Sequence, residues 1–300
     1  MTRSYYGRPI LKKPVWQHDI PAYFFTGGLA AGSALLAAGA DLTGRPRTRR
    51  AARLAALGAL GVSTYFLVND LGRPERFHHM LRVAKPTSPM SVGTWMLSAF
   101  GGAAGLAAAA EARPRGWTGR AGRLAGVGAA ALAPGIATYT AVLIADTAAP
   151  SWHAAADELP FAFAGSALAS GAAVGLIAAP MSEGGPARTL AVTGVALELA
   201  ATHRIETRLG LEGEPYRTGK AGRLLRAARA LNLAGAAGAV LGRRSRVLSA
   251  LSGVALLAGS LATRFGVFEA GVASTEDPKY VVEPQRGATP RHGSAPVRRP

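Results

Sequence analysis

Long stretches without any charged side chain are the feature that most constrains how this chain can fold. A helix that crosses the hydrocarbon core of a bilayer needs about 20 predominantly apolar residues, each rising about 1.5 Å, and four of the stretches reach that length outright. Two further segments, 187–207 and 221–242, are apolar but contain charges such as Glu198 and Arg226. Counting all of them predicts eight transmembrane helices. The uncharged stretches are Ile20–Ala40, Leu54–Asn69, Pro86–Ala110, Leu124–Ala145, Leu159–Ser182 and Val247–Thr263.

A soluble, alanine-rich helical protein is the main alternative, because the mean hydropathy is only +0.18. Amphipathic helices of soluble proteins place polar residues at every third or fourth position. Pro86–Ala110 and Leu159–Ser182 have no charge on any face. We therefore expect an all-α integral membrane protein. Glycine pairs at four-residue spacing would let helices approach closely in lipid: Gly28 and Gly32, Gly101 and Gly105, Gly171 and Gly175, and Gly238 and Gly242.

The predicted helices divide the chain into three parts. Residues 1–19 form an N-terminal segment outside the membrane, residues 20–270 a transmembrane domain, and residues 271–300 a proline- and arginine-rich tail whose end is expected to be disordered. The first segment lacks the apolar core of a cleavable signal. We therefore expect the first helix itself to direct insertion.

Charge and cysteine content limit the kinds of partner. The chain has a formal charge of +17, but its arginines lie in short loops between helices and not along one helix or patch, so anionic lipid headgroups are expected as partners and nucleic acid is not. The absence of cysteine excludes disulfides and thiolate ligation of metals or iron–sulfur clusters by this chain.

Eight helices put both termini on one side of the membrane, which we call face A, and the opposite side face B. The loops of face B are short and hold 13 lysines and arginines against three acids. Their charge density favours face B as the cytoplasmic side, whereas a raw count of basic residues favours the reverse. Face A also has loops 70–89, 146–158 and 204–222, and face B has loops 41–53, 111–123, 183–188 and 243–246.

The ionisable and strongly polar residues in or beside the predicted helices all fall in the half nearest face A. A charge at the centre of the bilayer costs roughly 2.5–3.5 kcal/mol on insertion scales, so this one-sided set predicts a polar cavity near face A. The alternative is that these side chains reach the interface or pair with one another. They are His18, Asp19, Asn69, Asp70, Asp146, Asp157, Glu158, Glu198, His203, Arg226, Arg229 and Arg264.

Tyr139 is placed deeper than the other polar residues. It precedes Asp146 by seven residues, which is two helical turns, so the two side chains share one face with Tyr139 about 10 Å deeper. A phenol at that depth can meet a lipid-soluble ligand. Tyrosine also belongs to ordinary interfacial belts, so the residue type alone does not decide between the two roles.

Four segments, taken together, resemble the polysulfide reductase membrane-subunit family, also called NrfD or PsrC. The pattern LGRPERF…MLRV.KPTSPMS.G in the second segment is long and specific. The segments are PAYFFTGGLAAGSALL at 21–36, NDLGRPERFHHMLRVAKPTSPMSVGTW at 69–95, TYTAVLIADTAAPSWH at 138–153 and FGVFEAGVASTEDPKYVVEPQR at 265–286.

The resemblance implies a fold, partners and a cofactor. The expected fold has eight transmembrane helices in two four-helix bundles, and the expected partners are an iron–sulfur electron-transfer subunit and a molybdopterin catalytic subunit. The expected cofactor is a quinone of the menaquinone type, bound by His18, Asp19 and Tyr139 near the face where the partner docks. Asp146, Asp70, Glu198 and His203 are the candidates for a proton relay.

The polar segment 70–89 is then expected to be the docking loop for the iron–sulfur subunit. Its prolines restrict its shape, and Ser88 before Pro89 is a predicted cap for the third helix. His78 and His79 are expected to be solvated or to contact the partner, and not to bind metal. The residues expected to pair with the partner are Arg73, Glu75, Arg76, Arg82 and Lys85.

Two other functions stay open from sequence alone. A proton or solute transporter would use similar buried charges, although its sites are expected near the midplane in broken helices. A passive anchor would hold a reductase at the membrane without binding quinone. His18 and His203, both near face A, are the only histidines in predicted helices, so one haem is conceivable but a pair across the bilayer is not. We expect no haem and no other redox centre on this chain. The expected location is the cytoplasmic membrane of a prokaryote.

Overall fold

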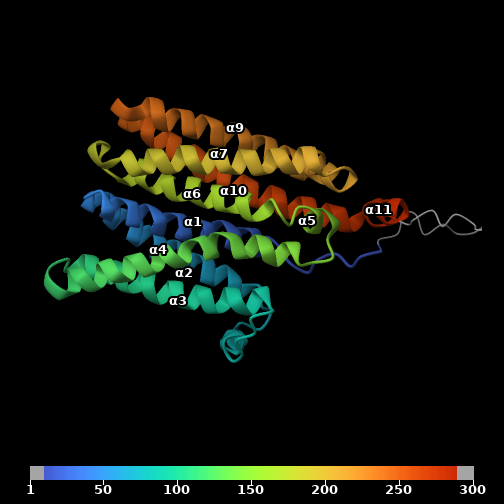
Figure 1. Cartoon of the computed structure of the whole chain (residues 1–300), viewed down its shortest axis with the longest axis horizontal. Coiled ribbons are helices and arrows are strands. Elements are labelled where there is room, and N and C mark those ends of the chain that lie inside the picture. Colours follow the sequence, from blue (N-terminus) through green and yellow to red (C-terminus); the bar gives the residue numbers. More distant parts are fainter. Residues whose placement is uncertain (1–9, 289–300) are drawn as a thin grey trace, which may run out of the picture.

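The structure is a computed structural model that describes residues 10–288, and this part of the chain is helical without a β-strand. Eight long helices lie side by side, the shortest with 20 residues and the longest with 31 (Figure 1). They are α1 (Asp19–Leu42), α2 (Pro46–Asn69), α3 (Pro89–Ala109), α4 (Gly116–Ala145), α6 (Leu159–Ala178), α7 (Gly185–Arg208), α9 (Gly219–Leu241) and α10 (Arg246–Glu276).

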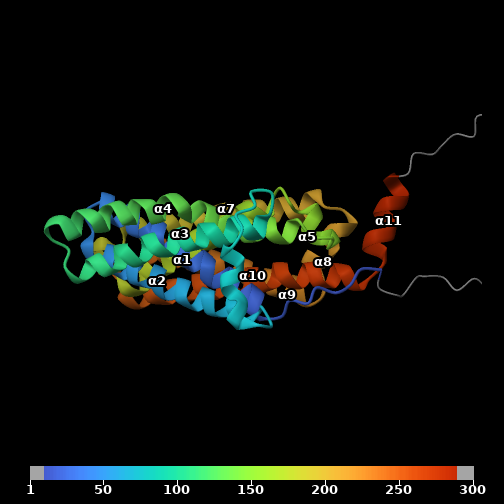
Figure 2. The same cartoon turned by 90° about the horizontal axis from the view of Figure 1, so that it is seen from below.

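Short helices connect the long ones. At face A lie α5, α8 and α11 (Figures 1 and 2), and a longer 3₁₀-helix, η1, follows α2. The short elements are η1 (Pro74–Leu81), η2 (Ala110–Ala112), α5 (Pro150–Ala154), η3 (Met181–Glu183), η4 (Leu211–Gly213), α8 (Glu214–Arg217), η5 (Gly242–Arg244) and α11 (Lys279–Ala288).

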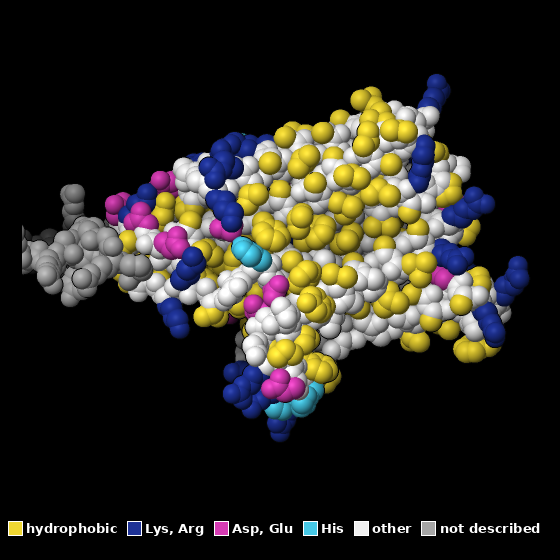
Figure 3. All heavy atoms as spheres, turned by 180° about the vertical axis from the view of Figure 1, so that it is seen from behind, with side chains coloured by type: hydrophobic (Ala, Val, Ile, Leu, Met, Phe, Trp, Pro, Cys, Tyr) yellow, Lys and Arg dark blue, Asp and Glu magenta, His cyan; other side chains and the backbone are white. Residues whose placement is uncertain are grey.

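Seven of the described helices are long and apolar enough to cross a membrane, and α7 is the long helix that falls outside this group. On the face seen in Figure 3, apolar side chains cover the broad middle of the molecule, and charged side chains gather towards its two ends. The described part of the chain is therefore all-α, with seven helices that are candidates to span a membrane, as the uncharged stretches predict. Helix α7 is long enough to span a membrane, with 24 residues, but charged residues such as Glu198 make it less apolar than the other long helices.

Helix α1 lies at the centre of the packing. It contacts α2 and α4 on one side and α6 on the other, and α6 also packs against α7 and α10. In Figure 1 the ribbons α2, α3 and α4 lie below α1, and α6, α7, α9 and α10 lie above it. Long helices joined by short loops pack closely as neighbours: α1 with α2, α3 with α4, α6 with α7, and α9 with α10.

The ends of the helices follow from local sequence. Ser88 precedes α3, and its hydroxyl accepts a hydrogen bond from the backbone N–H of Ser91 at 3.4 Å, which confirms the predicted cap. Ser245 caps α10 in the same way through the N–H of Leu248 at 3.3 Å. Helix α2 begins at Pro46, a residue type suited to the first helical position.

Two helices are longer than the sequence predicts. Because α2 begins at Pro46, Arg49 and Arg53 lie inside a helix and not in a loop. Helix α10 continues to Glu276, and α11 follows it, so the first part of the predicted tail is helical. The predicted disorder at the end of the tail concerns residues 289–300, which lie outside the described residues.

Glycines allow α1 and α6 to approach closely. A Cβ atom added to Gly32 would overlap the backbone of Ala167, and one added to Gly171 would overlap the backbone of Gly32. This part of the predicted glycine pattern is confirmed. At Gly105, in contrast, an added Cβ would meet nothing within 4 Å, so the pair Gly101 and Gly105 does not mark a close helix crossing.

We expect Gly171→Ala to destabilise the protein by about 1–3 kcal/mol, because the new methyl group forces α1 and α6 apart. The matched control Gly105→Ala should raise stability by up to about 1 kcal/mol, because alanine favours the helix where space is open. Unfolding of the purified variants in mixed detergent micelles measures both changes. Equal stabilities for the two variants would contradict the close packing at Gly171.

Candidate functional site

A cavity of about 70 Å³ lies near face A between α1, α2, α3 and α4. Its walls are mainly apolar, and its polar groups are the Tyr139 phenol, the Asp70 carboxyl and the hydroxyls of Thr94 and Tyr23. Segment 10–18, η1 and the starts or ends of all four helices contribute to it. The lining residues are Trp16, Ile20, Tyr23, Phe24, Leu67, Asp70, Leu71, Met80, Met90, Thr94, Tyr139 and Leu143.

The ring of Tyr139 packs directly against a glycine of the neighbouring helix α3. It projects from α4 and is 9% exposed. Its ring lies against Gly93 of α3, where an added Cβ would overlap the ring atoms. Any larger residue at position 93 would therefore displace the ring. The glycine in the segment SVGTW thus fixes the position of the phenol in the cavity wall.

Asp70 is the carboxyl group among the residues that line the cavity. It follows the last residue of α2, and its neighbour Asn69 donates a hydrogen bond to Asp19 at 2.6 Å. Burial raises the pKa of the Asp70 carboxyl above its ordinary value, and the negative charge of Asp19 raises it further. A carboxyl with a raised pKa retains a proton at higher pH and can exchange it with water at face A.

The structure brings only some of the predicted site residues together. Tyr139 and Asp70 line one cavity, and Asp19 lies next to it through Asn69. His18 is exposed, and its ring lies beside that of Phe265 on α10, with 6.5 Å between the ring centres. The predicted role of His18 in quinone binding stays a prediction.

Two predicted relay residues lie at the surface of the helices. Asp146 ends α4 and is exposed, as is His203 on α7. Tyr139 is buried in α4 two turns before Asp146, and its greater depth in the membrane stays a prediction. Neither Asp146 nor His203 is among the residues that line the cavity.

Glu198 belongs to a second buried polar cluster, formed by α7, α9 and α10. One of its carboxylate oxygens accepts hydrogen bonds from the amide of Asn232, at 2.9 Å, and from the hydroxyl of Thr263. The buried Arg264 donates to the carbonyl of Phe163 at 2.7 Å and lies 3.8 Å from the centre of its ring. A cavity of about 20 Å³ adjoins Glu198, which is room for one or two water molecules.

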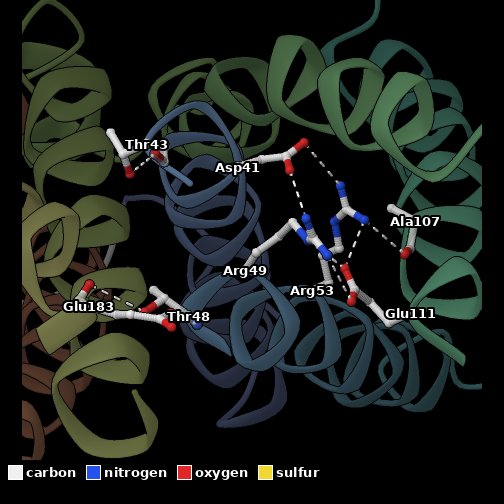
Figure 4. Close-up of polar contacts among 9 residues, drawn as sticks. Asp41, Thr43, Thr48, Arg49, Arg53, Ala107, Glu111 and Glu183 are labelled. Carbon is white, nitrogen blue, oxygen red and sulfur yellow. Dashed lines mark hydrogen bonds and ion pairs between the residues drawn. The ribbon is translucent and has the colours of Figure 1, made fainter. Parts of the chain in front are cut away.

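The predicted restriction of embedded charges to the half near face A is wrong. Glu111 and Arg53 are buried at face B, and Arg49 and Asp41 join them in one network (Figure 4). Glu111 accepts from Arg49 Nε at 2.8 Å and from Arg53 Nη1 at 2.9 Å. Arg49 also donates to Asp41 at 2.9 Å. The charge pattern predicts a loop at residues 41–53, whereas α2 begins at Pro46 and brings the arginines against η2, which follows α3.

The two faces differ in how their carboxyl groups are used. At face B the Glu111 carboxylate is matched by two arginines, so it is an internal ion pair that ties α2 to the end of α3. At face A, Asp70 lines a cavity together with a phenol. The candidate site therefore rests on this cavity and not on an uneven distribution of charge.

The predicted docking loop projects from the bundle of helices (Figure 1). Its 3₁₀-helix η1 has no buried residue. The rings of His78 and His79 lie at the surface, with 4.4 Å between the ring centres. The side chains are therefore free to contact another protein, and the docking role stays a prediction. All five predicted docking residues are exposed: Arg73, Glu75, Arg76, Arg82 and Lys85.

The sequence of the chain matches a known protein family. The sequence model described as polysulphide reductase, NrfD, matches residues 10–194, which is more than half of the chain. The chain belongs to the NrfD family. No curated protein matches it significantly. The residues matched to NrfD include every residue that lines the cavity beside Tyr139, whereas Glu198, Asn232, Thr263 and Arg264 lie beyond them.

Several residues of the site carried little sequence signal. Gly93 and Met90 belong to the quoted segment 69–95, but nothing in their spacing shows that one supports Tyr139 and the other closes the cavity. Trp16 lies in a segment without periodicity. Their positions depend on contacts between elements far apart in sequence, which only the packing of the helices defines.

Proposed function

We propose that this NrfD-family chain is the quinone-reactive membrane subunit of a redox complex. The observation that carries the proposal is the cavity near face A in which the Tyr139 phenol and the Asp70 carboxyl share apolar walls. A quinone needs a hydrogen-bond donor at its oxygens, a group that exchanges protons with water, and apolar walls for its ring and tail. The cavity offers all three.

The residues fit a quinone headgroup once two side chains move. Ligand pockets commonly enclose about 300–1,000 Å³, and this cavity encloses about 70 Å³. Met80 of η1 and Met90 at the start of α3 form part of its wall. Methionine side chains are flexible and adapt to irregular ligands. Met80 belongs to η1, which has no buried residue, and Met90 in the first turn of α3 is 52% exposed, so both side chains have room to move.

A bound quinone would exchange two electrons and two protons. In our proposal the Tyr139 hydroxyl donates a hydrogen bond to a quinone oxygen and orients the ring. Asp70 exchanges protons with water at face A. The negative charge of Asp19 favours the protonated form of Asp70. His18 and Asp146, both exposed near this face, are further candidates for the route to water, and Glu198 and His203 are more distant ones.

The proposal also concerns the arrangement of the helices and the partner subunits. We include α7 as an eighth span, which gives one four-helix group of α1–α4 and another of α6, α7, α9 and α10. The cavity then lies in the first group. An iron–sulfur subunit would dock on the loop 70–89 and pass electrons between the quinone and a molybdopterin catalytic subunit. The proposed location is the cytoplasmic membrane of a prokaryote, with face B in the cytoplasm.

We expect Tyr139→Phe to lower quinone-dependent turnover of the assembled complex about tenfold, because one hydrogen bond of about 1.4 kcal/mol to the ligand is lost. Tyr65→Phe is the control, since Tyr65 is 64% exposed on α2. Turnover is measured with a soluble quinol analogue in membranes that contain all subunits. Equal rates for both variants and the unmodified complex would leave only a passive anchoring role.

A further inference from the structure

A large groove at face B is not used by the proposed function. It lies between the end of α1, the start of α7 and the end of α9, and its volume is about 830 Å³. Three arginines from three separate segments line it, together with threonines and aliphatic side chains. The residues used below are Arg45, Arg188, Arg243, Thr189, Val192 and Val240.

Two of the arginines have buried donors without a partner in the described chain. Arg45 donates through Nη1 to the carbonyl of Ser182 at 3.0 Å, and Arg188 donates through Nη2 to the carbonyl of Met181 at 3.5 Å. The Nε atom of each guanidinium is buried and has no hydrogen-bond acceptor among the described residues. A buried donor without an acceptor is costly, so both guanidinium groups would gain from turning towards an acceptor in the groove.

No carboxylate balances the charge of the groove. None of its lining residues is acidic, and the positive charges of Arg243 and Arg45 act on Arg188. The nearby Glu183 forms no ion pair with these arginines among the described residues, and one of its carboxylate oxygens instead accepts a hydrogen bond from the backbone N–H of Thr48 at 2.8 Å (Figure 4). Three guanidinium groups that repel one another favour an anionic ligand.

The remaining wall of the groove is apolar and faces outward. Val192 on α7 is 43% exposed and Val240 on α9 is 40% exposed. The hydroxyl of Thr193, another lining residue, is bonded to the carbonyl of Thr189 at 2.9 Å and is thus occupied within its own helix. A ligand that satisfies both parts of the groove has an anionic head at the membrane surface and a hydrocarbon chain along α7 and α9.

We infer that this groove binds an anionic phospholipid, with its phosphate between Arg45 and Arg188 and one acyl chain against Val192 and Val240. Basic pockets between transmembrane helices are suited to such headgroups. A free phosphate ion would use the arginines but not the apolar wall. The inference concerns α7 and α9 and is independent of the quinone site.

The test is lipid retention by the purified full-length chain, measured by native mass spectrometry after addition of phosphatidylglycerol or phosphatidylcholine. The variant R45Q/R188Q removes two lining charges, and the control R47Q/R244Q removes two exposed charges from the same face. Each basic residue near an anionic headgroup contributes about fivefold in binding. We expect phosphatidylglycerol binding to fall about 25-fold in the first variant and less than about twofold in the control.

A second variant separates the groove from general surface charge. Thr189→Trp fills the groove from an exposed position and keeps all three arginines, so it should also lose phosphatidylglycerol. If R45Q/R188Q does not fold, the Thr189→Trp variant alone tests whether the lipid binds in the groove. Equal losses in R45Q/R188Q and the control, undiminished binding to Thr189→Trp, or full competition by inorganic phosphate would each overturn the inference.

Discussion

We expect Glu111→Ala to destabilise the protein by about 3–5 kcal/mol, because it leaves two arginines without their shared carboxylate in a buried position. The Glu111 side chain is 5% exposed and that of Arg53 is 7% exposed. Arg53 also has Asp41 at 3.7 Å, but this contact is longer than the one it loses. The remaining guanidinium would have to be buried with an incomplete set of acceptors.

The matched control is Glu276→Gln, which removes the exposed pair of Lys13 and Glu276, whose side chains are 61% and 55% exposed. Exposed pairs contribute about 0–1 kcal/mol, so this variant should unfold like the unmodified protein. The double variant R53M/E111L should lose less stability than Glu111→Ala, because it removes the unpaired charge as well. Unfolding in mixed detergent micelles gives all three values. A loss below about 1 kcal/mol for Glu111→Ala would contradict the buried network of Figure 4.

Gly93→Ala should lower quinone-dependent turnover of the assembled complex at least tenfold, while the protein remains folded. The added methyl group would overlap the ring of Tyr139. The ring then has to move into a cavity of about 70 Å³, where it occupies the place that we assign to the quinone. The effect is larger than that of Tyr139→Phe, since both the hydrogen bond and the space are lost.

Gly102→Ala is the control for this variant. Gly102 lies on the same helix, α3, and an added Cβ there would meet nothing within 4 Å. The two variants therefore change the same residue type in the same helix and differ in contact with Tyr139. Turnover is measured beside gel filtration, which shows that each variant is folded. Unchanged turnover in Gly93→Ala would show that the quinone does not depend on the position of the Tyr139 ring.

Much of the fold could be predicted from the distribution of charge along the chain. Each uncharged stretch overlaps one long helix, and the two charge-containing segments correspond to α7 and α9. The predicted cap at Ser88 is also present, because capping depends on residues close in sequence. These features are local, and local features are what a single sequence specifies best.

The contacts between charged residues at face B could not be predicted from the sequence. Arg53 and Glu111 are 58 residues apart, and their contact depends on how α2 packs against the end of α3. Arginines near a predicted loop suggest solvated side chains, and nothing nearby in sequence identifies their partner. In the same way, the sequence predicted Tyr139 and Asp70 as polar residues near face A but could not show that they share one cavity.

Photochemical cross-linking of a reactive quinone analogue to the assembled complex in membranes shows whether quinone binds in the cavity beside Tyr139. We expect cross-links to residues of segments 67–71, 80–94 and 139–143, all of which contribute to the cavity wall. Cross-links confined to α7, α9 and α10, or to the loops of face B, would contradict binding in this cavity.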